Sequence, residues 1–375
     1  MAGTRARTLS DLVDVDFPLF AFSHCRDVVA AVSRAGGFGV LGGAGFTPEQ
    51  LETELTWLDG AVNGRPYGID ILVPERSRTE PGLDLAGLSD LIAPEYRDFV
   101  TRILRDHDVP PPDRSTDSRM PGSLPEVGDA YLEVAFRHPI GLVVNALGTA
   151  PDFMFERARE RGIPVAALVG AKEHAIKQVR AGVDLLVAQG SEAGGHCGEV
   201  STMVLVPEVI KAIAPIAPVP VLAAGGIMTG RQMAAAMAMG AAGAWTGSVW
   251  LATPESEVSD SLRRKLIDAS SRDTVRSRYR TGKFSRQLRS AWHDIWESDD
   301  SPDPLPMPLM GLLTRPAMEA IDRAAEAGNP KARGLQTYYV GQGVGLVDGV
   351  RSCARIVHEF ITDFAEAVLD LRSRL

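Results

Sequence analysis

Eight short apolar runs recur along the chain, and most end in glycine or a small polar residue before a helical pattern begins. They are apolar throughout rather than alternating, which is typical of strands buried on both faces. Repeated strand–helix units predict a parallel sheet. Eight units favour an α/β fold of the closed (β/α)8 type, a TIM barrel, over the alternative of an open doubly wound sheet. The runs cover residues 18–23, 38–43, 67–73, 140–148, 164–170, 184–190, 219–226 and 243–248.

Helical patterns fill the stretches between these runs. Thr47 is expected to cap a helix whose first position is Pro48, and Thr229 is expected to cap another. A last helix over 350–372 carries apolar residues at helical spacing, so we expect it to pack back on the barrel. Together with these two, the helices expected before the last one cover residues 26–35, 47–58, 151–161, 171–181, 203–213 and 229–239.

Two stretches are too long for simple crossovers. Residues 75–139 contain a helical pattern over 89–107 and a segment rich in proline, serine and aspartate, which predicts an insertion after the third strand, at about 79–126. Residues 255–350 begin with a basic run over 263–289 that we interpret as helical. The pattern predicts a barrel with a helical lid subdomain over one mouth. The barrel is assigned to residues 1–255 and 350–375, including 75–139, and the lid to residues 256–349.

Charge and cysteine content limit the classes of partner. The chain has 375 residues and a formal net charge of −9, which gives no general reason to bind nucleic acid. No apolar run approaches the roughly 20 residues of a membrane span, and the N-terminus lacks the apolar core of a signal peptide. Cys25, Cys197 and Cys353 lie far apart without metal-ligand spacing, which indicates a reducing compartment. We therefore expect a cytoplasmic protein with neither a nucleic-acid nor a membrane partner.

Glycine-rich turns follow the seventh and eighth runs, at the end where such barrels carry their active sites. Gly225 and Gly226 precede a helix, and Gly247 follows the last run. These turns predict a phosphate site built from backbone N–H groups and a helix N-terminus, because a Cβ would hold a phosphate oxygen away from the amides. The alternative is that the glycines only permit tight turns.

The stretch Gly190–Gly198, GSEAGGHCG, follows the sixth run and holds the strongest candidate for catalysis. Its glycines leave His196 little to pack on, and an imidazole with its usual pKa near 6.5 can act as a base at neutral pH. A structural loop histidine is the alternative. No metal site is predicted, because His196 and Cys197 are adjacent and no second ligand pair occurs elsewhere. A nucleophilic Cys197 would have no activating partner except its neighbour.

Several segments together resemble the nitronate monooxygenase family, formerly called 2-nitropropane dioxygenases. The likeness spans residues 18–256 and 305–370. It implies a TIM barrel that binds FMN non-covalently. The segments that carry it are AVSRAGGFGVLGG (31–43), AQGSEAGGHCG (188–198), PVLAAGGIMTG (220–230), GAWTGSVWLATPES (243–256) and LPMPLMGLL (305–313).

The resemblance also implies roles for single residues. The backbone of the first strand would lie against the flavin ring, Gln189 and Gly194 would contact the ring or the ribityl chain, and the last two turns would hold the phosphate. His196 would take the α-proton of a nitroalkane, and O2 would complete the reaction. His24 and Gln342 are candidates for substrate contact. The residues assigned to FMN are Ala21, Phe22, Ser23, Asp70, Gln189, Gly194, Gly195, Gly225, Gly226, Trp245, Thr246, Gly247 and Ser248.

Two strands depart from the family pattern. Phe22, Ser23 and His24 stand where the family commonly has proline and methionine, and Asp70 stands where it usually has asparagine. A carboxylate beside a flavin disfavours the anionic reduced form unless it is protonated or neutralised. A related activity therefore stays open, that of an NAD(P)H-dependent FMN reductase acting on a quinone or an enoyl/CoA thioester. A flavin- or phosphate-binding module without turnover is the third hypothesis.

The basic run also bears on the partners. Arg276, Arg278 and Arg280 belong either to a solvated helix face or to a lid that meets a phosphate-bearing ligand. The expected partners are a small-molecule substrate (a nitronate, a quinone or a CoA thioester), O2, NAD(P)H in the reductase case, and a second copy of the chain if the protein is a homodimer.

Overall fold

The computed structural model describes residues 8–73, 85–112, 125–146 and 148–374. Its eight parallel strands pair in chain order, and β1 also pairs with β8, so that the sheet closes into a barrel. The predicted (β/α)8 fold is therefore confirmed. The strands are β1 Leu19–Ser23, β2 Phe38–Gly42, β3 Tyr67–Ile71, β4 Leu142–Asn145, β5 Val165–Val169, β6 Leu185–Gln189, β7 Val221–Ala224 and β8 Gly243–Thr246.

Alternate residues of each strand fill the barrel. Phe20, Phe38 and Val187 belong to the buried cluster of the interior. Their neighbours along the chain, such as Ala21, and the outward residue Ile69 belong to a larger cluster between the strands and the surrounding helices. Both faces of the sheet are thus buried, which explains why the runs are apolar throughout.

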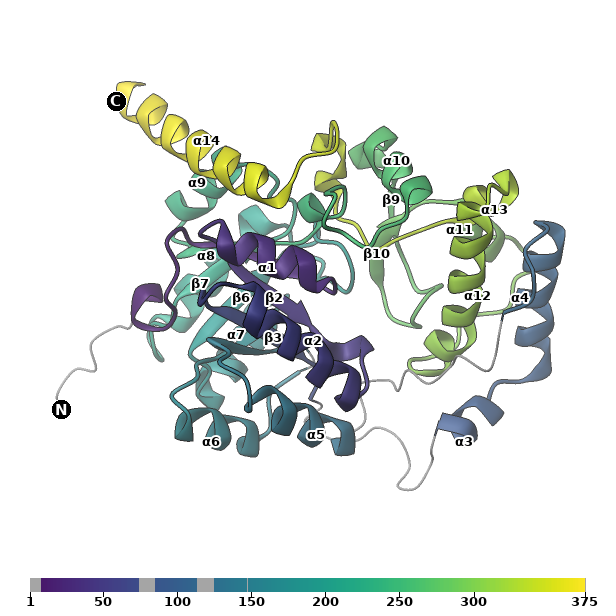
Figure 1. Ribbon diagram of the computed structural model, residues 1–375, viewed down its shortest axis with the longest axis horizontal. Coiled ribbons are helices and arrows are strands. Elements are labelled where there is room, and N and C mark those ends of the chain that lie inside the picture. The colour runs from purple at the N-terminus through teal and green to yellow at the C-terminus, as the bar shows by residue number, and fades with distance from the viewer. Residues whose placement is uncertain (1–7, 74–84, 113–124, 147, 375) are drawn as a thin grey trace.

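Eight helices among the described residues surround the barrel (Figure 1). Thr47 caps α2 as expected, because its hydroxyl accepts the N–H of Gln50 at 3.2 Å. None of the helices in the described ranges is long and apolar enough to cross a membrane. The helices are α1 Arg26–Arg34, α2 Pro48–Ala61, α5 Pro125–Ala135, α6 Asp152–Glu160, α7 Lys172–Ala181, α8 Thr202–Ile213, α9 Gly230–Ala238 and α14 Cys353–Arg374.

The insertion after β3 divides between two cores. The expected helix over 89–107 is broken into α3 (Leu85–Asp90) and α4 (Pro94–Asp106), because Pro94 starts a new helix at its first position. Helix α4 packs with the lid rather than with the barrel, and the ring of Phe99 meets Trp296 edge-on at 4.7 Å. Helix α5 instead packs on α2 and β3. The exact domain boundaries stay a prediction.

The lid contains four helices and a two-stranded hairpin. Figure 1 shows α4 beside α11, α12 and α13 on one side of the molecule. The prediction that the basic run over 263–289 is helical is wrong beyond Asp268, where α10 ends and a hairpin follows. Gly282, with φ +84°, turns the chain between the two strands. The lid elements are α10 Asp260–Asp268, β9 Thr274–Ser277, β10 Ser285–Leu288, α11 Ala291–Trp296, α12 Leu309–Glu326 and α13 Pro330–Leu335.

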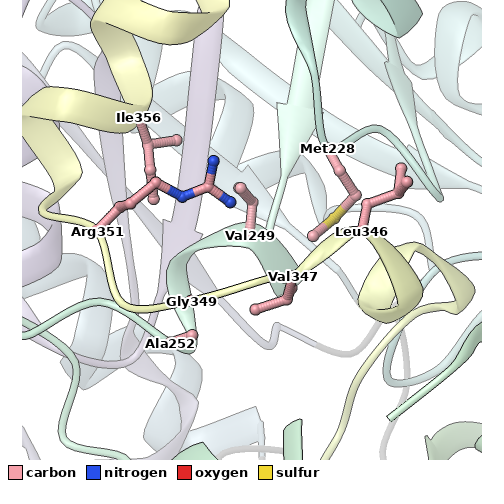
Figure 2. Close-up of a pocket in the computed structure, with 8 residues that line it drawn as sticks. All are labelled: Met228, Val249, Ala252, Leu346, Val347, Gly349, Arg351 and Ile356. Carbon is pink, nitrogen blue, oxygen red and sulfur yellow. The ribbon is translucent and has the colours of Figure 1, made fainter. Parts of the chain in front are cut away.

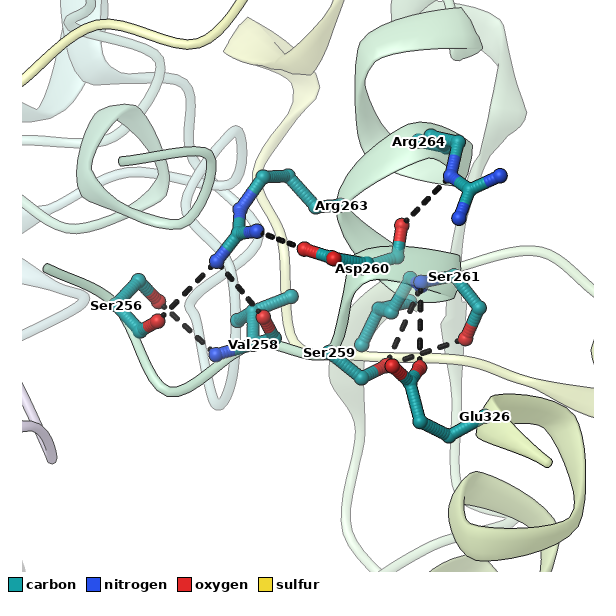
Figure 3. A network of polar contacts seen from close by, with 9 residues as sticks. Ser256, Val258, Ser259, Asp260, Ser261, Arg263, Arg264 and Glu326 are labelled. Carbon is teal, nitrogen blue, oxygen red and sulfur yellow. Dashed lines mark hydrogen bonds and ion pairs between the residues drawn. The ribbon is translucent and has the colours of Figure 1, made fainter. Parts of the chain in front are cut away.

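A polar network fixes the passage from barrel to lid (Figure 3). Arg263 donates to the carbonyl oxygens of Ser256 and Val258 at 3.3 and 3.0 Å. Ser259 caps α10, and the carboxylate of Glu326 in α12 accepts from the first turn of α10 at 3.4 Å. The start of the lid is therefore tied both to the chain that leaves β8 and to the longest lid helix.

The C-terminal helix packs back on the barrel as expected. Helix α14 lies along α9 and also meets α1. The closest approach is at Gly230, where an added Cβ would overlap the carbonyl oxygen of Phe360. Glycine at this position therefore lets two helices touch backbone to backbone.

We predict that Gly230→Ala lowers the free energy of unfolding by about 1–3 kcal/mol, because the methyl group must push α14 away. Gly60→Ala is the matched control, since Gly60 lies in α2 and an added Cβ would meet no atom within 4 Å. This change should stabilise by about 0.5–1 kcal/mol through helix propensity. Urea titration of both variants measures the difference, and equal effects would contradict the packing argument.

Candidate active site

The C-terminal ends of the strands form one rim, because all eight strands run parallel in a closed barrel. Ser23, Gln189 and Thr246 end β1, β6 and β8, and Asp70 lies one residue before the end of β3. The turns after β6, β7 and β8 leave from the same rim. The structure thus brings to one mouth most of the residues that the sequence proposes, including Gly194, Gly195, Gly225, Gly226, Gly247 and Ser248.

Aromatic side chains fill the barrel below this rim. Trp245 stacks on Phe20 and on Phe22, with ring centroids 6.2 and 6.1 Å apart. Ala21 points outward into the core between strands and helices, so only its backbone can meet a ligand at the mouth. The interior therefore offers a flat, apolar floor at β1 and β8.

Two hydroxyls at the rim already have structural partners. Thr246 donates to the carbonyl oxygen of Phe20 at 2.8 Å, which reinforces the closure of the barrel. The hydroxyl of Ser248 accepts the N–H of Gly341 at 2.8 Å. The Ser248 hydroxyl still has its own hydrogen to donate, so a ligand at this turn can meet both that hydroxyl and the backbone.

The glycine turns differ in what they require. Gly225 and Gly226 have φ of +115° and +71°, so their backbone conformation itself demands glycine. Gly247 has φ −131°, which any residue can adopt, and an added Cβ would meet no atom within 4 Å. The need for a tight turn is enough to explain glycine at positions 225 and 226. It does not explain Gly247, where the space beside the Cα is empty and could admit a ligand.

Two backbone N–H groups at the N-terminus of α9 already have partners within the protein. The N–H of Arg231 donates to the Asp363 carboxylate of α14 at 2.6 Å. The N–H of Gln232 donates to the hydroxyl of Thr229 at 3.2 Å. The first N–H groups of a helix are the ones that bind anions, so these two contacts leave fewer donors at this end for a phosphate, and the phosphate site stays a prediction.

His24 follows β1 and faces the mouth. Its Nδ1 lies 2.9 Å from the carbonyl oxygen of Gly42, and an added Cβ on Gly42 would lie 2.6 Å from that nitrogen. The ring meets Phe22 edge-on at 5.2 Å. Although the ring is exposed, desolvation by the surrounding protein lowers the pKa of His24, as expected for a side chain in an open recess.

His196 is held in a similar way by the lid. Its Nδ1 lies 3.1 Å from the carbonyl oxygen of Phe284 in the hairpin. A carbonyl only accepts, so Nδ1 carries the hydrogen and Nε2 of the neutral ring keeps its lone pair. The ring is exposed, yet desolvation lowers the pKa of His196, and the positive charge of Lys283 lowers it further against the effect of the Phe284 carbonyl. The ring is therefore a neutral base near pH 7.

The hairpin also fixes the loop that carries His196. Gly195 and Arg286 exchange two backbone hydrogen bonds of 3.0 and 2.8 Å. The buried Arg286 side chain donates from Nε to the carbonyl oxygen of Ser191 at 2.9 Å. An added Cβ on Gly194 would lie 2.8 Å from the backbone of Gly341. Gly194 is thus needed for close contact with the lid.

The alternative chemistries of the loop gain no support. Desolvation raises the pKa of the Cys197 thiol despite the nearby Arg276 and Arg286, so the nucleophilic thiolate is disfavoured. Within the described ranges, no group of three or more His, Cys, Asp or Glu side chains could hold a metal ion.

Gln342 is brought to the site by the segment that leaves the lid. It begins the short 3-10 helix η6, Gln342–Leu346, and its N–H donates to the carbonyl oxygen of Glu192 at 2.8 Å. Its side chain is exposed. Gln342 and His196 therefore flank the same loop, from two segments far apart in the sequence.

A small cavity lies behind the turn after β8 (Figure 2). Val249, Leu346, Val347 and Arg351 are among its lining residues, and the Arg351 guanidinium points toward Val249. Arg351 pairs with Asp348 at 2.6 Å. A second pocket, lined in part by Ala234 of α9, lies between α9 and α14. Neither pocket contains a predicted site residue.

The sequence reasoning missed the hairpin as a partner of the site. The group that orients His196 is the backbone carbonyl of Phe284, and no residue type is needed to provide it. Arg286 lay inside the basic run, but nothing marked it as the residue that holds the loop. Only the pairing of segments about 90 positions apart reveals these roles.

Comparisons with known proteins agree with this geometry. The family model described as "Nitronate monooxygenase" matches residues 8–363. A Mycobacterium tuberculosis protein named as a monooxygenase is 48% identical, over 97% of this chain and 98% of its own length. A Staphylococcus saprophyticus protein named as a nitronate monooxygenase is 30% identical, over 93% and 95% of the two chains.

Solved structures of related enzymes superpose over nearly the whole chain. Nitroalkane oxidase from Streptomyces ansochromogenes is 27% identical with a TM-score of 0.78, over 97% of this chain and 99% of the other. FabK from Thermotoga maritima is 26% identical with a TM-score of 0.70, over 99% and 100%. The barrel, the loop after β6 and these matches together show that the chain is an oxidoreductase of the nitronate monooxygenase family.

Proposed function

We propose that the protein is an FMN-dependent nitronate monooxygenase that oxidises alkyl nitronates with O2 and uses His196 as the catalytic base. The observation that carries this proposal is the hydrogen bond of 3.1 Å between Nδ1 of His196 and the carbonyl oxygen of Phe284. It leaves Nε2 unprotonated on a solvent-accessible ring at the end of the barrel where chemistry takes place.

The mouth has features that suit FMN. The aromatic floor of Phe22 and Trp245 offers an apolar surface to a flat ring, and the open space beside Gly247 allows a phosphate to approach backbone N–H groups. When bound, FMN supplies the electron transfer between substrate and O2. The residues proposed to hold it are Ala21, Phe22, Ser23, Asp70, Gln189, Gly194, Gly195, Gly225, Gly226, Trp245, Thr246, Gly247 and Ser248.

His196 would act on neutral nitroalkanes. The C–H bond α to the nitro group breaks, the proton moves to Nε2, and the electron pair moves into the nitro group to give a nitronate anion. The Phe284 carbonyl then accepts a hydrogen bond from the imidazolium, which stabilises the charge that forms. His24 and Gln342 are proposed to contact the substrate from the β1 and lid sides.

A second candidate function is an NAD(P)H-dependent FMN reductase of a quinone or a CoA thioester. The observation that favours it is a pair of arginines on the hairpin. The Arg276 guanidinium lies 5.4 Å from the ring of Phe284, and that of Arg280 lies 4.3 Å from the ring of Tyr339. One nitrogen of each has no partner among the described residues. Arg276 lies close to the His196 loop, because it faces the same Phe284 whose carbonyl binds His196, and a cation there would attract the phosphate groups of a cofactor or thioester.

Anaerobic mixing with NAD(P)H separates the two functions. We expect the purified protein to carry the yellow colour of a flavin, and we expect this colour to persist when NADH or NADPH is added without O2. Oxygen uptake on addition of a preformed nitronate is then expected. Rapid bleaching by NAD(P)H, weakened in Arg276→Ala/Arg280→Ala, would instead establish the reductase.

We predict that His196→Asn lowers kcat/KM for a neutral nitroalkane by about 100-fold or more, since removal of a general base has this order of effect. The same variant should turn over the preformed nitronate almost as wild type does, because that substrate has already lost its proton. His358→Asn, an exposed change on α14, is the control. Parallel steady-state assays decide, and equal losses on both substrates would disprove the role as base.

We predict that Lys283→Met shifts the acid limb of the pH profile for neutral nitroalkanes to higher pH. Lys283 lowers the pKa of His196, so its removal raises that pKa, and a higher pH is then needed to obtain the neutral base. Lys211→Met on α8 is a matched control far from the site. Profiles of kcat/KM between about pH 5 and 8 measure the shift. A shift to lower pH, or none at low salt, contradicts the assignment.

A further inference from the structure

Asp70 is a buried carboxyl group with an unusual setting. Its register partners on the neighbouring strands are Gly42 and Val144, and Val144 belongs to the interior cluster of the barrel. Ile69 and Ile71 on either side belong to the outer core. Side chains alternate along a strand, so Asp70 points into the barrel just below the rim. It is only 5% exposed.

The carboxyl group has no cationic partner among the residues that the structure describes. One oxygen, Oδ1, is enclosed by protein and receives no hydrogen bond. The backbone of Ala146 is the one hydrogen-bonding group that favours the charged form. The imidazole of His24 lies against Gly42, the register partner of Asp70. Its Nδ1 is engaged by the Gly42 carbonyl, and desolvation by the surrounding protein lowers its pKa.

An ionised carboxylate would be poorly solvated in this place. Burial of an unpaired charge is strongly unfavourable, and a carboxyl group avoids it by keeping its proton. The raised pKa of Asp70, caused by desolvation, agrees with this reasoning. A protonated carboxyl has an O–H that donates, and it keeps lone pairs that can accept the Ala146 N–H.

We propose that Asp70 is a neutral carboxylic acid at physiological pH, and that its O–H is the hydrogen-bond donor that β3 offers to the cofactor at the barrel mouth. The second half rests on the proposed function, whereas the first half concerns the chain alone. A neutral donor explains how a carboxyl group can stand beside a cofactor that gains negative charge on reduction. Asp70 acts as a positioning residue for that cofactor.

Infrared difference spectroscopy of the apoprotein tests the protonation state without any cofactor. At pH 7 the wild-type spectrum should contain the C=O stretching band of a protonated carboxyl group that is absent from Asp70→Asn. Asp106→Asn, which changes an exposed carboxylate on α4, should leave that band in place. A wild-type spectrum that matches Asp70→Asn in this region overturns the proposal, because Asp70 would then be ionised.

FMN titration of the apoprotein, followed by flavin fluorescence, tests the donor. Asp70→Asn keeps an N–H donor of similar shape, so its Kd should stay within about threefold of wild type, whereas Asp70→Ala should bind about tenfold more weakly. Equal Kd values for all three proteins overturn the donor role.

If Asp70→Ala does not fold, the reduction potential of bound FMN provides a second test. A potential that is unchanged in Asp70→Asn supports a neutral donor, and a raised potential contradicts it. If wild type binds no FMN, the proposed function fails, and the infrared result still decides the protonation state.

We further predict that Asp70→Asn becomes progressively more stable than wild type as the pH rises from about 4 to 8. The unfolded chain releases the Asp70 proton near its usual pKa of about 4, whereas the folded chain keeps it to much higher pH. Asp70 therefore contributes stability below about pH 4 that is lost as the pH rises. Urea titrations of both proteins across this range measure the difference. A difference that does not grow with pH contradicts the neutral form.

Discussion

The hydrogen bonds between β1 and β8 close the sheet, and the site depends on that closure. A closed parallel barrel sends all eight C-terminal ends to one rim and removes water from its interior. The first condition places Ser23, Gln189 and Thr246 at the same mouth, although more than 220 residues separate the first from the last. The second condition gives a low-dielectric interior, which accounts for the raised pKa of the buried Asp70 carboxyl.

The lid supplies the groups that orient the His196 loop. The hairpin pairs with Gly195 and presents the Phe284 carbonyl to His196, so the same contact that fixes the loop also selects the tautomer of its imidazole. His24 is oriented in the same way by the Gly42 carbonyl. Backbone acceptors thus set the protonation pattern of both histidines at the mouth, and the side chains that surround them tune their pKa values.

Much of the architecture could be predicted because it follows from local pattern. The eight strands fall within the eight apolar runs, since each run is apolar enough to be buried on both faces and is bounded by small residues. The lid was harder. The basic side chains of residues 274–288 are compatible with an exposed helix, yet the two ends of this segment, 274–277 and 285–288, pair as strands. Contacts with Gly195 and Tyr339 stabilise that pairing, and those contacts are invisible in a local window.

The sequence by itself determined the (β/α)8 barrel, the catalytic candidate His196 and the membership of the family, because these depend on periodic burial and on a motif of adjacent residues. Tertiary structure alone decided which atoms the site can use. It engaged the N-terminus of α9 through Asp363, oriented His196 through Phe284 and enclosed Asp70 between Gly42 and Val144. Each of these outcomes joins segments distant in the chain, and hydrogen bonding and desolvation depend on that proximity rather than on residue type.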